Sequence, residues 1–347
     1  MRDQILLPET GLYKANLHCH TTVSDGRLTP EEIKELYMSE GYSIVAYTDH
    51  REYVWHKELD DENFLALPSM EANLTEKGDY WPTERTFHFN LYDTRPSKDR
   101  EGGDYMPHCD YHDKTGINEY IARMVQEGFL VCYNHPYWSL QDVTDYCDLE
   151  GLFAMEIYNH GSELEGMYGF SPQAYDEMLR SGQRIYCVAA DDNHNVFPKG
   201  DVQFDALGGC TYIAAESLTQ ESVIDALKDG RFYWSTGPKL LGMEIRDDVL
   251  RVKCSPVEKL YVIQNGRNYY RKTVHPGESF TEAEFKLSGQ EGWFRVEIRD
   301  ARGQAAVHHQ DALFVFPVHL FRLISQFVWM AVPPPRRRPG RGREPAR

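Results

Sequence analysis

The sequence predicts an α/β protein whose sheet is mostly parallel, followed by a small antiparallel β-sandwich. From residue 13 to about 231, short apolar segments alternate with helical patterns, which is typical of a parallel sheet covered by helices. After residue 236 the helical patterns stop and only strand-like alternation continues. The length of 347 residues suits one barrel-sized domain and a smaller second domain.

Eight strands and four helices are expected in the first part of the chain. The strands are expected at residues 14–20, 43–50, 66–73, 86–93, 129–136, 152–160, 185–194 and 209–215. The helices are expected at residues 29–41, 116–128, 171–182 and 218–230. The first helix has the clearest limits, with Thr29 as N-cap, Pro30 at the first helical position and Gly41 at the end.

The second part is expected to hold four strands, at residues 240–248, 249–255, 259–266 and 292–300. We therefore divide the chain into a barrel-type domain (1–235), a β-sandwich domain (236–306) and a tail (307–347) outside the fold.

A long polar segment, residues 94–116, is too polar for the core and too long for an ordinary connection. It is either a lid over a site or a floppy insertion.

The tail has an unusual composition. Residues 312–332 form an apolar run long enough to span a bilayer, and an Arg- and Pro-rich segment follows. Arg322 at the centre of the run, with Pro317 and His319, argues against insertion. We interpret the residues after about 307 as foreign to the fold, with a native last strand of the sandwich missing. A membrane anchor is the alternative.

Composition narrows the function. A net charge of −17 argues against binding to a nucleic-acid polymer, which needs clustered Lys and Arg. The seven cysteines are scattered without any C-x-x-C spacing, which favours a reducing cytoplasm over a disulfide framework. The first residues lack an apolar run of signal-peptide length. A cytoplasmic protein acting on a small molecule is expected, and the oligomeric state stays open.

Two pairs of residues spaced two apart, His18 with His20 and Asp192 with His194, indicate a metal site. Residues i and i+2 of a strand point to the same side, so His18 and His20 project together at the end of the first strand. Two neutral imidazoles facing one point are half of a metal site. The same parity joins Asp192 to His194 and turns Asp191 away.

Further residues of the same chemical types end other strands. In the segment YTDH, His50 is expected as the ligand and Asp49 as the residue that orients it. In a barrel-type protein the carboxyl ends of the strands converge on one mouth, so distant residues can meet there. The expected ligands are His18, His20, Asp25, His50, Glu71, His88, His135, Asp192 and His194.

Other residues near these motifs stay ambiguous. One strand carries three such residues on the same side, Glu156, Tyr158 and His160. They either touch the substrate, or pack in the core, or form hydrogen bonds to the metal ligands. His108 and His112 lie in the polar segment 94–116 and are expected to be solvated.

The ordered motifs HCHTTVSDG, TDH, NHP and DNH, with Glu71 and His88 between them, resemble the PHP (polymerase and histidinol phosphatase) superfamily. The resemblance covers about residues 13 to 231. It implies a distorted seven-stranded β/α barrel with two or three metal ions. By motif position, one ion takes His18, His20, Glu71 and Asp192, a second takes Glu71, His88 and His135, and a third takes Asp25, His50 and His194.

The segment GRFYWSTGP and the sandwich after it resemble the branch of that superfamily with carbaryl-type ester hydrolases. Nitrogen and oxygen ligands without thiolate suit zinc, manganese or iron and do not choose among them. We expect a hydroxide bridging two ions to hydrolyse the phosphate ester of a small molecule or nucleotide, with Glu71, Asp192 and Asp49 taking part directly. The alternatives are hydrolysis of a carboxylic or carbamate ester and a non-catalytic binding module.

Overall fold

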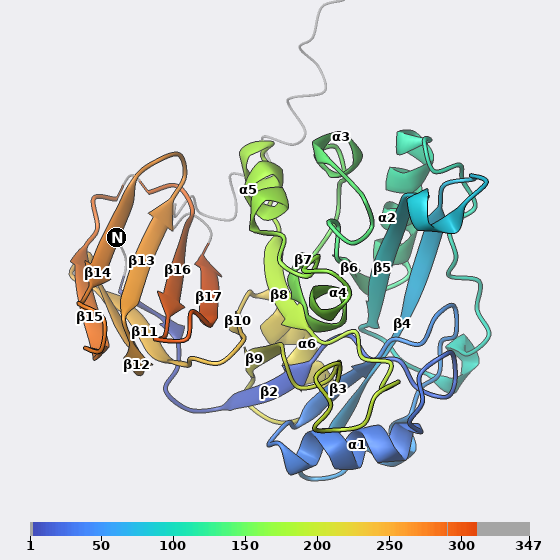
Figure 1. Ribbon diagram of the computed structural model, residues 1–347, viewed down its shortest axis with the longest axis horizontal. Helices are drawn as coiled ribbons and strands as arrows, with labels where there is room; N and C mark the ends of the chain where they lie inside the picture. Colours follow the sequence, from blue (N-terminus) through green and yellow to red (C-terminus); the bar gives the residue numbers. More distant parts are fainter. Residues whose placement is uncertain (1–2, 290, 311–347) are drawn as a thin grey trace, which may run out of the picture. The chain divides into compact units, whose positions relative to one another are not determined.

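The computed structural model describes residues 3–289 and 291–310, and its largest element is a sheet of thirteen strands (Figure 1). Its strand order is β14-β13-β16-β17-β10-β9-β2-β3-β4-β5-β6-β7-β8. The segment from β9 to β8 contains the predicted barrel strands, which are β2 (Leu12–Asn16), β3 (Ile44–Tyr47), β4 (Leu65–Thr75), β5 (Thr86–Asp93), β6 (Phe129–Tyr133), β7 (Ala154–Asn159), β8 (Tyr186–Ala190) and β9 (Cys210–Ala214). The α/β fold is confirmed.

This part of the sheet is mixed in direction. β2, β3 and β4 run parallel to one another, as do β6, β7 and β8. β5 is antiparallel to both of its neighbours, and β9 is antiparallel to β2. The seven-stranded count stays a prediction, because eight strands stand in this order and two of them are reversed.

The two ends of this strand order meet at Thr211. The Thr211 hydroxyl on β9 donates to the carbonyl of Ala189 on β8 at 3.0 Å, and the Ala189 amide lies 3.3 Å from the same oxygen. A side chain thus joins β8 to β9 where no ladder pairs them in the described residues. The buried core inside includes Ala15, Ile44 and Leu67, all fully enclosed.

The four predicted helices are confirmed as α1 (Pro30–Ser39), α2 (Lys114–Gln126), α5 (Pro172–Arg180) and α6 (Gln220–Lys228). Two shorter helices, α3 (Val143–Tyr146) and α4 (His160–Leu164), were not expected. Thr29 caps α1 in a capping box with Glu32, in which each side chain bonds to the other residue's backbone amide. This cap fixes the start of the helix directly after the loop that holds the first histidines.

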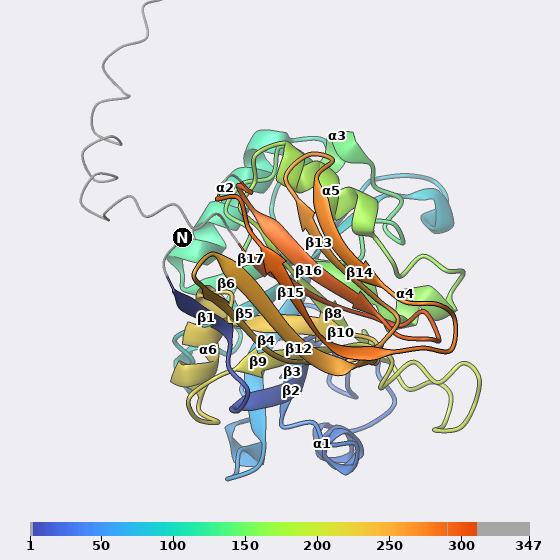
Figure 2. The same cartoon turned by 90° about the vertical axis from the view of Figure 1, so that its left-hand side faces the viewer.

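The C-terminal strands form two antiparallel layers, in agreement with the expected sandwich (Figure 2). One layer is a separate sheet of β1 (Gln4–Leu7), β11 (Leu240–Arg246), β12 (Val249–Val257) and β15 (Phe280–Lys286). The other is the end of the large sheet, made of β13 (Lys259–Gln264), β14 (Tyr269–Thr273), β16 (Phe294–Arg299) and β17 (Ala305–Gln310).

The sandwich and the barrel strands share a ladder. β10 (Phe232–Ser235) pairs with β9 on one side and with β17 on the other. The expected domain limits stay a prediction, but the last strand runs on to Gln310, past the limit at 306. β1, from the start of the chain, pairs in the sandwich. The apolar run 312–332 and the basic segment after it lie outside the described residues.

The polar segment 94–116 is anchored by two tyrosines. Tyr105 and Tyr111 are buried in the main apolar cluster, and Met106 and Cys109 pack against it. The side chains that make the segment polar remain at its surface, where His108 is exposed. The two buried tyrosines argue against a floppy insertion, and the lid over a site stays a prediction. Among the described helices, none combines the length and the apolar character needed to cross a membrane.

Candidate metal centre

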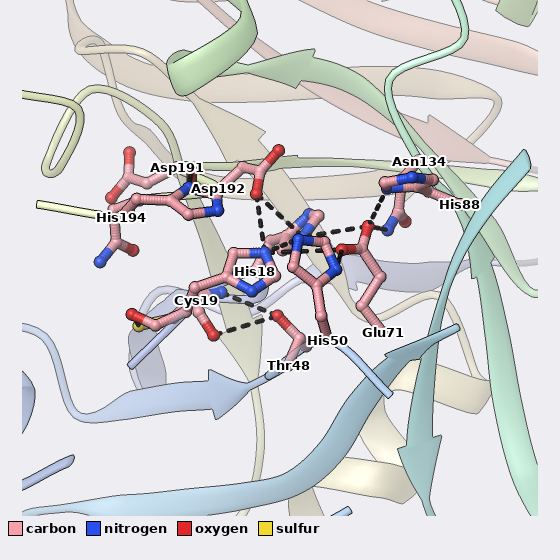
Figure 3. Close-up of polar contacts among 12 residues, drawn as sticks. His18, Cys19, Thr48, His50, Glu71, His88, Asn134, Asp191, Asp192 and His194 are labelled. Carbon is pink, nitrogen blue, oxygen red and sulfur yellow. Dashed lines mark hydrogen bonds and ion pairs between the residues drawn. The ribbon is translucent and has the colours of Figure 1, made fainter. Parts of the chain in front are cut away.

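All nine predicted ligand residues lie together at one edge of the barrel strands. Figure 3 shows His18, His50, Glu71 and His88 converging from β2, β3, β4 and β5, or from the loops that follow them. Their nitrogen and oxygen atoms form four overlapping groups, within each of which all the atoms are no more than 4.8 Å apart. The groups are His20, Asp25, His50 and His194; His18, Glu71 and His135; His18, His20 and Asp192; and His50, Glu71 and His88.

Glu71 lies at the centre of these groups. Its Oε1 atom is 2.9 Å from His88 Nδ1 and 3.3 Å from His18 Nε2, and its Oε2 atom is 2.8 Å from His50 Nδ1. The amide of Asn134 donates to Oε1 at 2.8 Å. Glu71 is fully buried, so it reaches three histidines on three different elements without contact with solvent.

Asp192 forms a second bridge. Its Oδ1 atom lies 3.0 Å from His20 Nε2 and 3.1 Å from His18 Nε2. The side-chain amide of Asn159 donates to its Oδ2 atom at 3.0 Å. Asp192 therefore lies against both histidines of the first motif, in the grouping that the family resemblance implied.

Asp25 gathers the third group. Its carboxylate lies 3.4 Å from His194 Nε2, 3.8 Å from His50 Nε2 and 3.9 Å from His20 Nδ1. The loop that carries it folds back closely at Gly26, where an added Cβ would lie 2.4 Å from the His20 carbonyl oxygen. Only glycine fits there, so the residue after Asp25 sets the path of the loop.

Three of the histidines are held through their other ring nitrogen. His18 Nδ1 lies 2.6 Å from Glu156 Oε1, and His135 Nδ1 lies 3.1 Å from the Ser139 hydroxyl. His194 Nδ1 lies 3.1 Å from a backbone carbonyl, that of residue 192. A proton on each Nδ1 leaves Nε2 free to bind an ion, which is the usual arrangement in histidine metal sites.

Glu156, which the sequence left ambiguous, therefore contacts two of the proposed metal ligands, His18 and His135. Its Oε2 atom accepts from the backbone amide of His135 at 3.2 Å and from Asn159 at 2.9 Å. It is fully buried. The signal in the sequence was its strand parity, but parity alone could not tell a ligand contact from a packing residue.

Asp49 differs from its predicted place. It was expected to orient the ring of His50, but its side chain is hydrogen-bonded to the loop after His20. Its carboxylate accepts from the Thr21 amide at 2.8 Å, the Thr21 hydroxyl at 2.9 Å and the Ser24 hydroxyl at 2.8 Å. Asp49 therefore holds the loop that bears Asp25.

Asp191 faces away from the groups, as parity predicted. Its carboxylate accepts from the backbone amides of Leu207, Gly208 and Gly209 at 2.8 to 2.9 Å and from the Tyr37 hydroxyl at 2.8 Å. It fixes a loop behind the site.

The remaining ambiguous residues have ordinary partners. Tyr158 OH lies 3.0 Å from His160 Nδ1, and both stand apart from the four groups. His108 and His112 are exposed and pair with Asp104 and Glu76.

The carboxylates and imidazoles shift one another's pKa. Burial alone would lower the pKa of His18, but the charges of Asp192, Glu156 and Glu71 raise it well above its ordinary value. Burial lowers the pKa of His20 to about 4, although Asp192 opposes the shift. Burial would raise the pKa of Glu71, but the surrounding histidines lower it well below its ordinary value. The central carboxylate is therefore ionised.

Asp25 and His194, in the third group, also shift each other's pKa. The hydrogen bond from His194 lowers the pKa of Asp25. Burial would lower the pKa of His194, but Asp25 and Asp192 raise it to about 9. An ion that binds this histidine displaces a proton, so affinity for the ion falls at low pH.

The backbone is strained where two of these residues leave their strands. Asp192 has φ 54° and His135 has φ 25°, both in the left-handed region that non-glycine residues rarely occupy. Such strain costs about 1 to 3 kcal/mol per residue and persists at sites where the surrounding structure enforces it.

The residues present fit bound divalent cations. His20 Nδ1 is buried and has no hydrogen-bond partner in the described structure, yet it faces Asp25. Unpartnered buried nitrogen is costly, and a cation removes that cost. Imidazole and carboxylate donors without thiolate suit zinc, manganese and iron alike.

Part of the chain is similar in sequence to a known polymerase. No family model matches the chain. Over 94 residues, 22% of this chain, it is 42% identical to the DNA polymerase/3'-5' exonuclease PolX of Bacillus subtilis, of whose length the match covers 16%. The activity of the whole polymerase is therefore no guide to this chain.

Two solved structures are also similar. One, from Bacteroides vulgatus, is a two-domain protein described as containing a predicted PHP-like metal-dependent phosphoesterase, with 17% identity, 90% of this chain and 99% of that one covered, and a TM-score of 0.45. The other, from Bifidobacterium adolescentis, is described as a candidate metal-dependent phosphoesterase, with 15% identity, 61% and 94% covered, and a TM-score of 0.36. The chain is thus similar to proteins described as metal-dependent phosphoesterases, one of them as PHP-like. The carbaryl-type branch stays a prediction.

Proposed function

We propose that this chain is a metal-dependent hydrolase that cleaves the phosphate ester of a small molecule or nucleotide. The observation that carries the proposal is that four groups of ligand-type atoms share Glu71, His18, His20 and His50. Groups that share members suit two or three ions held side by side, which is the arrangement used for in-line displacement at phosphorus.

The proposed ligands divide into the sets that the sequence indicated. Glu71 and Asp192 would hold one ion with His18 and His20, Glu71 would hold a second with His88 and His135, and Asp25 would hold a third with His50 and His194. Divalent ions at such a site ionise a water molecule near neutral pH and offset negative charge on the ester. Zinc, manganese and iron remain equal candidates.

The chain's own charges explain why cations are required. Glu71, Asp192 and Asp25 place three carboxylates at the site, and their pKa values are lowered, so all three are ionised at neutral pH. A doubly charged phosphate ester would be repelled by them. Without ions, the protonated rings of His18 and His194 offset part of this charge. Bound cations would displace those protons and supply the positive charge that attracts the ester.

The chain's neutral groups set the geometry. Asn134 holds Glu71, and Asn159 links Asp192 to Glu156. Each amide donates to a carboxylate oxygen that is not free to rotate, which fixes the ligands before any ion binds. Asp49, proposed from the sequence as a catalytic residue, acts in this proposal by positioning the loop of Asp25.

The proposal is tested by metal analysis of the purified protein together with hydrolysis of p-nitrophenyl phosphate and p-nitrophenyl acetate. We expect two or three equivalents of a divalent metal, loss of turnover with a chelator and a higher kcat/KM for the phosphate. A higher kcat/KM for the acetate would contradict the phosphoesterase and favour a carboxylic ester as the substrate. Turnover that survives the chelator would contradict the metal-dependent mechanism.

Glu71→Gln is the decisive variant, with the exposed Glu62→Gln as its control. We expect Glu71→Gln to lose at least one metal equivalent and to lower turnover by about 100-fold or more, because it removes a charge that several ligands share. Circular dichroism checks that the fold is kept. Full metal content and full turnover in this variant would contradict the shared-ligand arrangement.

A small-molecule substrate and a cytoplasmic location complete the proposal. The net charge of −17 disfavours a nucleic-acid polymer as substrate. The scattered cysteines, all free in the described residues, suit a reducing compartment.

A further inference from the structure

Two tryptophans stand beside the proposed metal centre without being part of it. The ring of Trp138 lies 5.1 Å from the ring of His135 and 5.9 Å from that of His88, between ring centroids. The ring of Trp81 lies 6.2 Å from that of Trp138, nearly edge to face. We call these two residues the tryptophan pair.

Trp138 is held in place on several sides. Its indole nitrogen donates to Glu165 Oε2 at 2.6 Å, and its ring is half-buried against the two histidines. It follows directly on the strained turn at His135 and Pro136. Its position is therefore set by the same backbone that sets a proposed ligand.

Trp81 has much less to hold it. It lies in a short 3₁₀ helix, Trp81–Thr83, within the connection between β4 and β5, the strands that carry Glu71 and His88. Its exposed fraction is 64%, although an indole is the largest apolar side chain. Large exposed aromatic groups beside a site are typical of ligand-binding surfaces, because their apolar area is covered only when the ligand binds.

The tryptophan pair lies on the side of the centre that holds His88 and His135. The group of Asp25, His50 and His194 is followed in the sequence by the exposed residues Arg27 and Arg51.

We infer that the tryptophan pair binds a flat aromatic or heteroaromatic group of the substrate while the ester group lies at the metal centre. The inference rests on the proposed function and narrows it to esters that carry such a ring, for example aryl phosphates or nucleotides. A ring that packs against Trp81 covers the face that is now exposed, and Trp138 forms the floor next to the proposed ligands.

The experiment compares two inhibitors with the same charged head. Phenylphosphonate and methylphosphonate both offer a phosphonate to the metal ions, but only the first carries a ring. Their inhibition constants are measured on the metal-loaded full chain, with p-nitrophenyl phosphate as the reporter. We expect phenylphosphonate to bind more tightly by about fivefold to tenfold, the range of a single aromatic contact.

In Trp81→Ala this preference should fall to within about twofold, and Trp81→Phe should restore most of it. Tyr269→Ala, which removes an aromatic side chain of similar exposure (53%) from β14, is the matched control and should keep the full preference. Tryptophan fluorescence gives a readout independent of turnover, because phenylphosphonate should change the emission of the wild type more than that of Trp81→Phe.

Equal inhibition by the two phosphonates in the wild type would overturn the inference and leave the proposed function standing. A preference that Trp81→Ala keeps in full would also overturn it. Lack of inhibition by either phosphonate, with metal bound, would instead count against the phosphoesterase, and the inference would fall with it.

Discussion

Glu156 shows how one buried side chain governs several others. It meets His18 through one oxygen and the backbone of His135 and the amide of Asn159 through the other. It binds no ion in our proposal, yet it decides which nitrogen of His18 carries the proton. A carboxylate in this position also makes the imidazole a stronger ligand.

We therefore predict that Glu156→Gln weakens metal affinity by about 10- to 100-fold while the fold is kept. The amide occupies the same space, but it carries no charge to strengthen the His18 ligand. Competition with a chelator of known affinity measures the change, and the exposed Glu150→Gln is the control. Unchanged affinity would mean that Glu156 serves only the packing of β7.

Single residues could be predicted from sequence where chemistry and spacing agreed. His18 and His20 lie together, and Asp192 lies beside them while Asp191 binds backbone amides behind the site. Strand parity is not what turns Asp192 toward the site, however, because β8 ends at Ala190. Asp192 lies beyond the strand, with left-handed backbone angles. Asp49 could not be placed, since a carboxylate that binds backbone amides has the same sequence appearance as one that binds a histidine.

At the scale of elements, the loop from Thr21 to Gly26 carries Asp25 and depends on Asp49. Asp49 accepts two side-chain and two backbone hydrogen bonds from Thr21 and Ser24. A short loop with no regular structure keeps its shape through such bonds. The position of Asp25 is therefore set by a residue that follows β3, on a different part of the chain.

Asp49→Asn should loosen this loop, because the amide replaces an acceptor by a donor on one side. We expect the loss of one metal equivalent from the group of Asp25, with the ion near Glu71, His88 and His135 retained. Metal analysis and turnover are measured together. Full metal content with lost turnover would contradict the positioning role and support the direct catalytic role that the sequence suggested.

The direction of β5 was not predicted, although a clue was present. Apolar alternation is the same in parallel and antiparallel strands, so it does not give direction. Most of the motif residues follow the end of a strand, whereas His88 is the third residue of β5. It reaches the site because β5 runs against its neighbours, which places Asn73 opposite His88. A ligand at the start of a strand is the sequence signature of a reversed strand.

At the scale of the whole molecule, the large sheet passes from the barrel strands into the sandwich through β10 and β17. His308 on β17 lies at this junction, fully enclosed, with Nδ1 2.7 Å from the carbonyl oxygen of Phe232 on β10. Burial lowers the pKa of His308 to about 4, because the charged ring loses its hydration there. The junction therefore holds a neutral histidine at physiological pH.

This gives a prediction of stability against pH. The pKa of His308 is near 6.5 in the unfolded chain and lower in the folded one, so below about pH 6.5 protons bind the unfolded chain preferentially. Its contribution to stability is complete above that pH and is lost as the pH falls towards 4. His308→Asn keeps the donor to Phe232 but does not titrate.

Urea unfolding of both proteins at about pH 7.5 and about pH 5 measures the difference. We expect the wild type to lose about 2 kcal/mol more free energy of unfolding than His308→Asn between these values. The comparison between the two proteins removes the effect of the other histidines. An equal loss in both would show that His308 is not buried in its neutral form.

The shared ladder between β10 and β17 could not be read from the sequence, because register between distant strands depends on tertiary packing. It has a practical consequence for anyone who produces the domains separately. A chain that ends at residue 235 would leave the whole edge of β10 without its partner β17. An uncovered edge strand is a template for pairing with another copy, so such a fragment would tend to aggregate. In the full chain β17 covers this edge of β10, so this route to self-association is closed.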